Sequence, residues 1–159
     1  MSADQKFLEE AQRLGFPVDA EVLPGGNYVP TLLHGDLLFI SGQVPRVGSE
    51  VVSIGAVGEQ VSLEQAQRAA QVCVLRALSL AKARMGSLSR IQAVAKVGVF
   101  VRSAPDFTQQ TEVANGASDL LLRVFGERGR HTRTSVGVLQ LPKGASVEVE
   151  FVFCVAREP

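Results

Sequence analysis

The chain has 159 residues, 46% of them hydrophobic and 20% charged, a composition typical of one globular domain and not of a disordered segment. Sixteen basic residues balance sixteen acidic residues, so the formal net charge is zero and no basic excess indicates a nucleic-acid-binding surface. The charged N-terminal segment lacks the apolar core of a signal peptide, and no apolar run is long enough to span a membrane. We therefore expect a cytoplasmic protein, in which the two cysteines are buried, reduced thiols.

The N-terminal third predicts a helix followed by short strands. Residues 3–14 carry apolar side chains at helical spacing, and Gly15 follows them as a stop signal. Pro17 comes next, and we expect this helix to pack on another part of the chain. The strands expected after it lie at residues 20–23, 28–33, 36–41 and 51–53. The middle two form a hairpin, because His34 and Gly35 lie at a turn between them.

Two longer helices are predicted in the rest of the chain. The first begins at Ser62, which forms a capping box with Gln65, and it ends at Gly86. The second is expected to begin at residues 104–106 and to run to about Phe125. Further strands are expected at residues 91–102, 131–138 and 146–153, with a turn at 141–144. Because both helices are amphipathic, we expect both on one face of a single sheet, and a second subunit over the partly apolar other face.

Arg133 carries the main chemical signal, because it lies within a run that otherwise predicts a half-buried strand. A buried guanidinium needs an anion, since removing its hydration is costly. Glu148 and Glu150 alternate with apolar residues in the last strand and so share one of its faces. Two interpretations have equal weight: Arg133 forms an ion pair with Glu148 inside the protein, or its planar fork binds the carboxylate of a small ligand.

The other candidate residues give less direct signals. His34 and His131 lie near no acidic or cysteine cluster, so no metal site is predicted. The sequence contains no nucleophile-elbow or phosphate-loop motif, and no cofactor is expected. Asn115 and Gly116 interrupt the second long helix. Either the glycine is tolerated at a cost of about 1 kcal/mol, or the asparagine faces a pocket.

Together these residues resemble the Rid family, the reactive intermediate deaminases, which are also called YjgF-like and were once labelled endoribonuclease L-PSP. The resemblance extends from about Gly25 to Arg157. The segments that carry it are residues 26–29, 38–45, 97–101, 106–107, 115, 133–138, 141–143 and 147–150. The Ser-Gly-Gln-x-Pro stretch and the spacing from the arginine through Leu-Pro to the glutamate are specific in combination.

The resemblance implies an α+β, chorismate-mutase-like fold: a mixed sheet with two helices packed on one face. Members of the family are typically homotrimers with clefts between subunits, which agrees with the uncovered sheet face expected above. The resemblance also implies a division of the chain into an N-terminal helix and extension, residues 1–24, and one Rid-like domain, residues 25–159.

The activity implied by the resemblance is hydrolytic deamination of reactive enamines and imines, of the 2-aminoacrylate type, to 2-keto acids and ammonia. In that reaction Arg133 would bind the substrate carboxylate, and Glu148 would orient or activate the attacking water. Tyr28, Ser41 and Asn115 would shape the cleft around the substrate.

A second hypothesis keeps the same cleft without catalysis, in a sensor or regulatory protein that binds a small carboxylate. It predicts saturable binding without turnover. Ribonuclease activity, the older family label, is disfavoured by the zero net charge and the lack of an aromatic-basic surface. We therefore expect a small carboxylate as the ligand and further copies of the chain as partners, with neither nucleic acid nor membrane.

Overall fold

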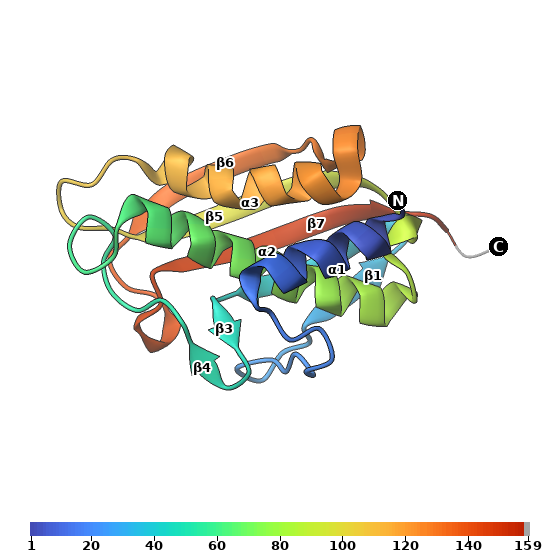
Figure 1. Cartoon of the computed structure of the whole chain (residues 1–159), viewed down its shortest axis with the longest axis horizontal. Coiled ribbons are helices and arrows are strands. Elements are labelled where there is room, and N and C mark those ends of the chain that lie inside the picture. The colour runs from blue at the N-terminus through green and yellow to red at the C-terminus, as the bar shows by residue number, and fades with distance from the viewer. Residues whose placement is uncertain (158–159) are drawn as a thin grey trace.

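In the computed structural model, which describes residues 1–157, a mixed five-stranded sheet lies beneath a layer of helices (Figure 1). In spatial order its strands are β1 (Thr31–His34), β2 (Leu37–Gln43), β7 (Val147–Val155), β5 (Ile91–Arg102) and β6 (Thr132–Val138). β5 and β6 run parallel, whereas the other neighbours run antiparallel. Two short strands, β3 (Arg46–Val47) and β4 (Glu50–Val51), form a separate ribbon. The predicted α+β class with a mixed sheet is confirmed.

The two long helices, α2 (Leu63–Met85) and α3 (Gln110–Phe125), pack on one face of the sheet, as their amphipathic patterns predict. α2 begins at the predicted capping box, in which Ser62 Oγ accepts from the Gln65 amide at 3.1 Å and the Gln65 side chain accepts from the Ser62 amide at 2.9 Å. Short 3-10 helices occupy connections: η1 (Leu88–Arg90), η2 (Gly126–Gly129) and η3 (Pro142–Gly144). No helix in residues 1–157 is long and apolar enough to cross a membrane.

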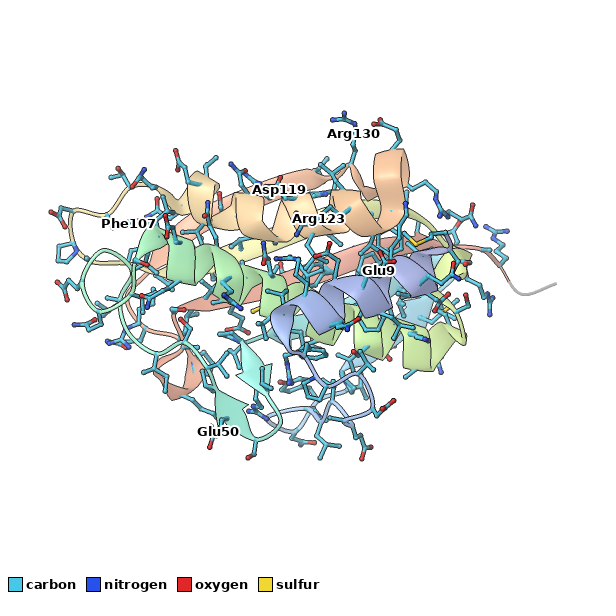
Figure 2. All side chains as sticks on the ribbon, viewed as in Figure 1. Glu9, Glu50, Phe107, Asp119, Arg123 and Arg130 are labelled. Carbon is cyan, nitrogen blue, oxygen red and sulfur yellow. The ribbon has the colours of Figure 1, made fainter. Side chains whose placement is uncertain are left out.

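α3 begins later than its sequence pattern indicates. Residues 104–109 form a turn in which the Phe107 amide donates to the Ala104 carbonyl at 3.0 Å, in the loop seen in Figure 2. The Gln110 side chain then donates to the Phe107 carbonyl at 2.9 Å and to Ser103 Oγ at 3.2 Å. The expected start at residues 104–106 is wrong, because this turn and the Gln110 side chain already use the local donors and acceptors.

Gly116 lies where α2 and α3 approach each other closely. A side-chain carbon on Gly116 would overlap the Gln67 carbonyl oxygen and would lie 2.9 Å from the carbonyl carbon. Gln67 Nε2 also donates across the interface to the Glu112 carbonyl at 2.8 Å. The glycine therefore has a packing role, because any side chain at this position would push the two helices apart.

The helix α1 (Ala3–Leu14) packs against both α2 and α3, which confirms that the N-terminal helix docks on the rest of the chain (Figure 1). Phe7 and Ala11 are buried in the same core as the longer helices. Glu10 of α1 forms an ion pair with Arg123 of α3 at 2.8 Å, and Figure 2 shows Arg123 on the part of α3 that faces α1.

The segment between α1 and the sheet differs from the prediction. Residues 20–23 form no strand, so that expectation is wrong; Pro24 removes a backbone donor beside them, and Leu23 is 58% exposed. The hairpin that follows is confirmed as β1 and β2, with Gly35 in its turn at a φ of 62°. The short strand expected at residues 51–53 is present in part, as β4, which begins one residue earlier and ends at Val51.

The sheet face opposite the helices is largely uncovered within one chain. Glu148 and Glu150 of β7 alternate with buried residues and lie on this face, as predicted. Phe39 and Val136 share the face and are 40% and 41% exposed. An apolar surface of this kind is typical of an interaction surface.

Candidate functional site

Arg133 lies on β6 with its side chain on the helix side of the sheet, because its cross-strand neighbour Val97 is buried beneath the helices. Its Nη1 donates to Asn115 Oδ1 at 2.9 Å and to Ser118 Oγ at 2.8 Å, and its Nη2 donates to the Thr111 carbonyl at 3.3 Å. All three acceptors are neutral and belong to α3. In the part of the chain that the structure describes, no carboxylate forms an ion pair with this guanidinium. The guanidinium is therefore held in one orientation, but no carboxylate of the described residues neutralises its charge.

Ser118 links Arg133 to His131 in a chain of hydrogen bonds. Because arginine only donates, the Ser118 hydroxyl accepts from Arg133, and its Oγ lies 2.8 Å from His131 Nε2. His131 Nδ1 lies 2.6 Å from the carbonyl oxygen of Gly129, which only accepts, so Nδ1 carries a proton. In the neutral imidazole Nε2 is then an acceptor, to which the Ser118 hydroxyl donates. Burial lowers the pKa of His131, and the nearby charge of Arg133 lowers it further, against the hydrogen bond to Gly129.

Arg133 and Glu148 lie on opposite faces of the sheet. On β5, the neighbour of Arg133 is Val97 and the neighbour of Glu148 is Phe100. Val97 and Phe100 are three positions apart on one strand, an odd offset, so their side chains point to opposite sides of the sheet. The ion pair between Arg133 and Glu148 inside one chain, one of the two interpretations of the sequence, is therefore wrong.

Glu148 lines a cavity of about 170 Å³ where β2 ends and β7 begins. Gly42 of β2 leaves room for this carboxylate, since a side-chain carbon at that position would overlap Glu148 Oε1. Burial raises the pKa of Glu148, and the charge of Glu150 raises it further. A half-buried carboxyl group with a raised pKa is suited to accept and return a proton.

Tyr28 lines the same cavity as Glu148, and its hydroxyl accepts from the Gly25 amide at 3.2 Å. Ser41 lies beside them but not in the cavity lining: its Oγ donates to the Val29 carbonyl at 2.8 Å. That bond ties the segment carrying Tyr28 to β2. The structure thus brings Tyr28 to Glu148 and Asn115 to Arg133. Ser41 does not line the cavity but holds the segment that does.

Ser118 and Arg76 are further candidates that the sequence patterns do not single out. Ser118 follows Asn115 by three positions on a helix, and this spacing is a signal that both face the same neighbour. Arg76 interrupts the apolar side of α2 and is only 6% exposed. Removing the hydration of Arg76 costs more than removing that of Arg133, because Arg76 is buried more completely.

The two cysteines differ in burial. Cys73 on α2 is fully buried, as expected, and burial raises the pKa of its thiol far above the ordinary value. Cys154 on β7 is half-buried on the open face, so its expected burial is only partly correct. Neither thiol forms a disulfide.

A larger cavity of about 500 Å³ lies between the end of α1, the β3–β4 ribbon and the start of α2. Its lining is mainly apolar, and Arg68 is the charged residue on its wall. It brings together no acid and base that could exchange a proton. This cavity is therefore a weaker candidate for a proton-transfer site than the surroundings of Arg133 and Glu148.

The fold and the site together define an α+β protein of chorismate-mutase-like architecture, with a guanidinium held on one sheet face and a carboxyl group of raised pKa on the other. The family model described as "YjgF/chorismate_mutase-like, putative endoribonuclease" matches residues 10–154. The chain belongs to this YjgF/RidA family, the endoribonuclease L-PSP-like proteins, and the predicted family is confirmed.

Three similar proteins illustrate the relationship. Protein TCP17 of Trypanosoma cruzi is 46% identical over 149 residues, which cover 93% of each chain. The crystal structure of Atu1372, a protein with unknown function from Agrobacterium tumefaciens, is 39% identical, with a TM-score of 0.87 over 97% of this chain and 95% of that one. The crystal structure of RidA from Psychrobacter sp. PAMC 21119 is 21% identical with a TM-score of 0.55, over 87% and 96% of the two chains, and it supports the fold alone.

Proposed function

We propose that this chain hydrolyses reactive enamines and imines, of the 2-aminoacrylate type, to 2-keto acids and ammonia in a cleft between copies of a homotrimer. The observation that carries the proposal is the guanidinium of Arg133, which α3 orients through neutral oxygens only. One copy supplies Arg133 and Asn115, and the next supplies Glu148, Tyr28 and Ser41. Membership of the family and the apolar open face of the sheet support this arrangement.

The proposed reaction relies on orientation and proton transfer. Arg133 binds the substrate carboxylate, and an enamine first becomes the imine by taking a proton on its terminal carbon and losing one from nitrogen. Glu148 accepts a proton from water while the water oxygen bonds to the electrophilic imine carbon, and it returns that proton to nitrogen to give a carbinolamine. The hydroxyl proton of the carbinolamine then passes to nitrogen through Glu148 as the carbon–nitrogen bond breaks, so ammonia leaves and the carbonyl of the keto acid forms. Burial of Glu148 favours this role, because a raised pKa brings the carboxyl group nearer to the pH at which it works.

The test is to generate 2-aminoacrylate with a serine dehydratase and to follow keto-acid release with and without this protein. We expect Arg133→Ala to lose all acceleration, because the substrate carboxylate then has no counterion. Arg84→Ala is the matched control, since Arg84 is an exposed arginine in the last turn of α2, whereas Arg133 lies on β6 and Glu148 on β7. If Arg133→Ala is as active as the parent protein, the site assignment is wrong.

Glu148→Gln separates catalysis from binding. The amide cannot accept a proton, so we expect turnover to fall while affinity for a keto acid such as pyruvate is kept. Isothermal titration calorimetry measures the affinity, and the coupled dehydratase assay measures turnover. A parent protein that binds pyruvate saturably but does not accelerate hydrolysis would instead identify the chain as a sensor or regulatory protein with the same cleft.

A further inference from the structure

Arg76 is a second arginine without an acidic partner, and it is buried more deeply than Arg133. It is 6% exposed, on the side of α2 that packs toward β2 and β3. Its Nε donates to Gln43 Oε1 and its Nη1 to the Arg46 carbonyl, each at 3.2 Å. Both acceptors are neutral, and within residues 1–157 no carboxylate pairs with this guanidinium. An unpaired buried guanidinium is costly, so a bound anionic ligand would stabilise it.

Arg46 places a second positive charge beside Arg76. The Nε of Arg46 is buried and has no hydrogen-bond partner among the described residues. Burial lowers the pKa of Arg76, and the charge on Arg46 lowers it further, so the two guanidiniums are close enough to repel each other. Glu21 lines a small adjoining cavity with both arginines but forms no ion pair with either in the described chain. Two like charges therefore lie close together, and no carboxylate of residues 1–157 forms an ion pair with either.

Both arginines line the cavity that contains Glu148. Its wall also includes Lys143, an exposed residue, and the segment that carries Tyr28. Glu148 forms no ion pair with these cations in residues 1–157. The cavity thus has a carboxyl group with a raised pKa at one position and a cluster of cations at another. A ligand that spans the two positions would carry its reacting carbon beside Glu148 and a negative charge beside Arg46 and Arg76.

We propose that Arg46 and Arg76 form a subsite for the distal carboxylate of a dicarboxylic substrate, so that this chain prefers imines derived from acidic amino acids. This inference rests on the proposed function, in which Arg133 of another copy binds the α-carboxylate. A carboxylate fits better than a phosphate, because planar guanidinium groups match it in bidentate fashion, and because its single charge is repelled less by Glu148 and Glu150. The volume of about 170 Å³ suits a side chain of a few carbons.

Direct binding tests the subsite without reference to catalysis. Glutarate and valerate have the same carbon chain and differ in one terminal carboxylate, so isothermal titration calorimetry with both isolates the distal charge. We expect glutarate to bind at least about tenfold more tightly, and Arg46→Gln to remove most of that difference, since a charge-assisted bidentate contact is lost. Arg68→Gln is the control, because Arg68 is an exposed arginine on the same helix as Arg76. Equal affinity for the two acids overturns the inference, as does a preference for inorganic phosphate over glutarate.

Kinetics then separate this inference from the proposed function. An amino-acid oxidase generates the imine of glutamate or of norvaline, and keto-acid release gives kcat/KM for each. We expect a preference of about tenfold or more for the dicarboxylic imine, and a fall in that ratio for both Arg46→Gln and Arg76→Gln. Hydrolysis of both imines with no preference would keep the proposed function and reject the subsite. Selective binding of glutarate without hydrolysis of either imine would keep the subsite and reject the proposed function.

Discussion

Mixing two inactive variants tests whether the site is assembled from two copies of the chain. Arg133→Ala lacks the cation that binds the carboxylate, and Glu148→Gln lacks the group that accepts the proton. Because Arg133 and Glu148 lie on opposite faces of one sheet, a substrate that contacts both side chains must contact two copies. Mixed trimers of the two variants are therefore expected to contain some clefts in which both wild-type side chains are present.

The size of the recovered activity follows from the proposed homotrimer, in which each cleft would take Arg133 from one copy and Glu148 from the next around a closed ring. With equal amounts of the two variants, each requirement is met for half of the copies, so about a quarter of the clefts are intact and about a quarter of the parent activity returns. The assay is keto-acid release after the two variants are unfolded together in denaturant and refolded as a mixture.

The control mixture combines Arg133→Ala with the double variant Arg133→Ala/Glu148→Gln. It contains no intact cleft, so it should show no recovery. If the first mixture is no more active than the average of its two components, although exchange of tagged subunits shows that mixed oligomers have formed, then the two residues do not act in one intersubunit cleft.

Other predictions concern stability and pH. Gly116→Ala should lower the free energy of unfolding by about 1–3 kcal/mol in denaturant titrations, because the added carbon meets the Gln67 backbone; a gain of about 1 kcal/mol, as for an exposed helix glycine, would contradict the packing argument. Phe7→Ala should cost about 3–5 kcal/mol, since Phe7 is 1% exposed, whereas Leu8→Ala, 44% exposed, should change stability by about 0.5 kcal/mol or less. The depressed pKa of His131 means that its contribution to stability is present above the ordinary histidine pKa of 6.5 and is lost as the pH falls through its lower folded value. Unfolding curves across this range should therefore show a smaller acid-induced loss for His131→Gln than for the parent protein.

Local signals account for the parts of the fold that the sequence predicts well. The capping box at Ser62 and Gln65 and the turn at Gly35 depend on residues a few positions apart, and both are present as expected. Errors arise where a segment depends on distant neighbours. Residues 20–23 have strand-like side chains but meet no sheet edge, and the start of α3 is set by a side chain of Gln110 that returns to Phe107.

The candidate site is likewise predicted only in the part that local patterns determine. Alternation along one strand is enough to place Glu148 and Glu150 together, because neighbouring residues point to opposite faces. The relation of Arg133 to Glu148 is not a property of either strand alone. It depends on the parallel register between β5 and β6 and on the antiparallel register between β5 and β7, which no local pattern encodes.

The two arginines without acidic partners in the described chain, Arg133 and Arg76, and the raised pKa of Glu148 have a common electrostatic explanation. Arg133 and Arg76 are both stabilised by neutral oxygens, while the ion pairs within residues 1–157 use other acids, such as Glu10 and Glu127. A carboxyl group that had an arginine partner in the same chain would have a lowered pKa and would be a poor proton acceptor. Keeping the arginines free of protein acids therefore keeps their charge for a ligand and keeps Glu148 able to exchange a proton. A dicarboxylate bound to Arg46 and Arg76 should leave the pKa of Glu148 raised or raise it further. A downward shift of that pKa when glutarate binds would show that the ligand does not occupy the cationic subsite beside Glu148.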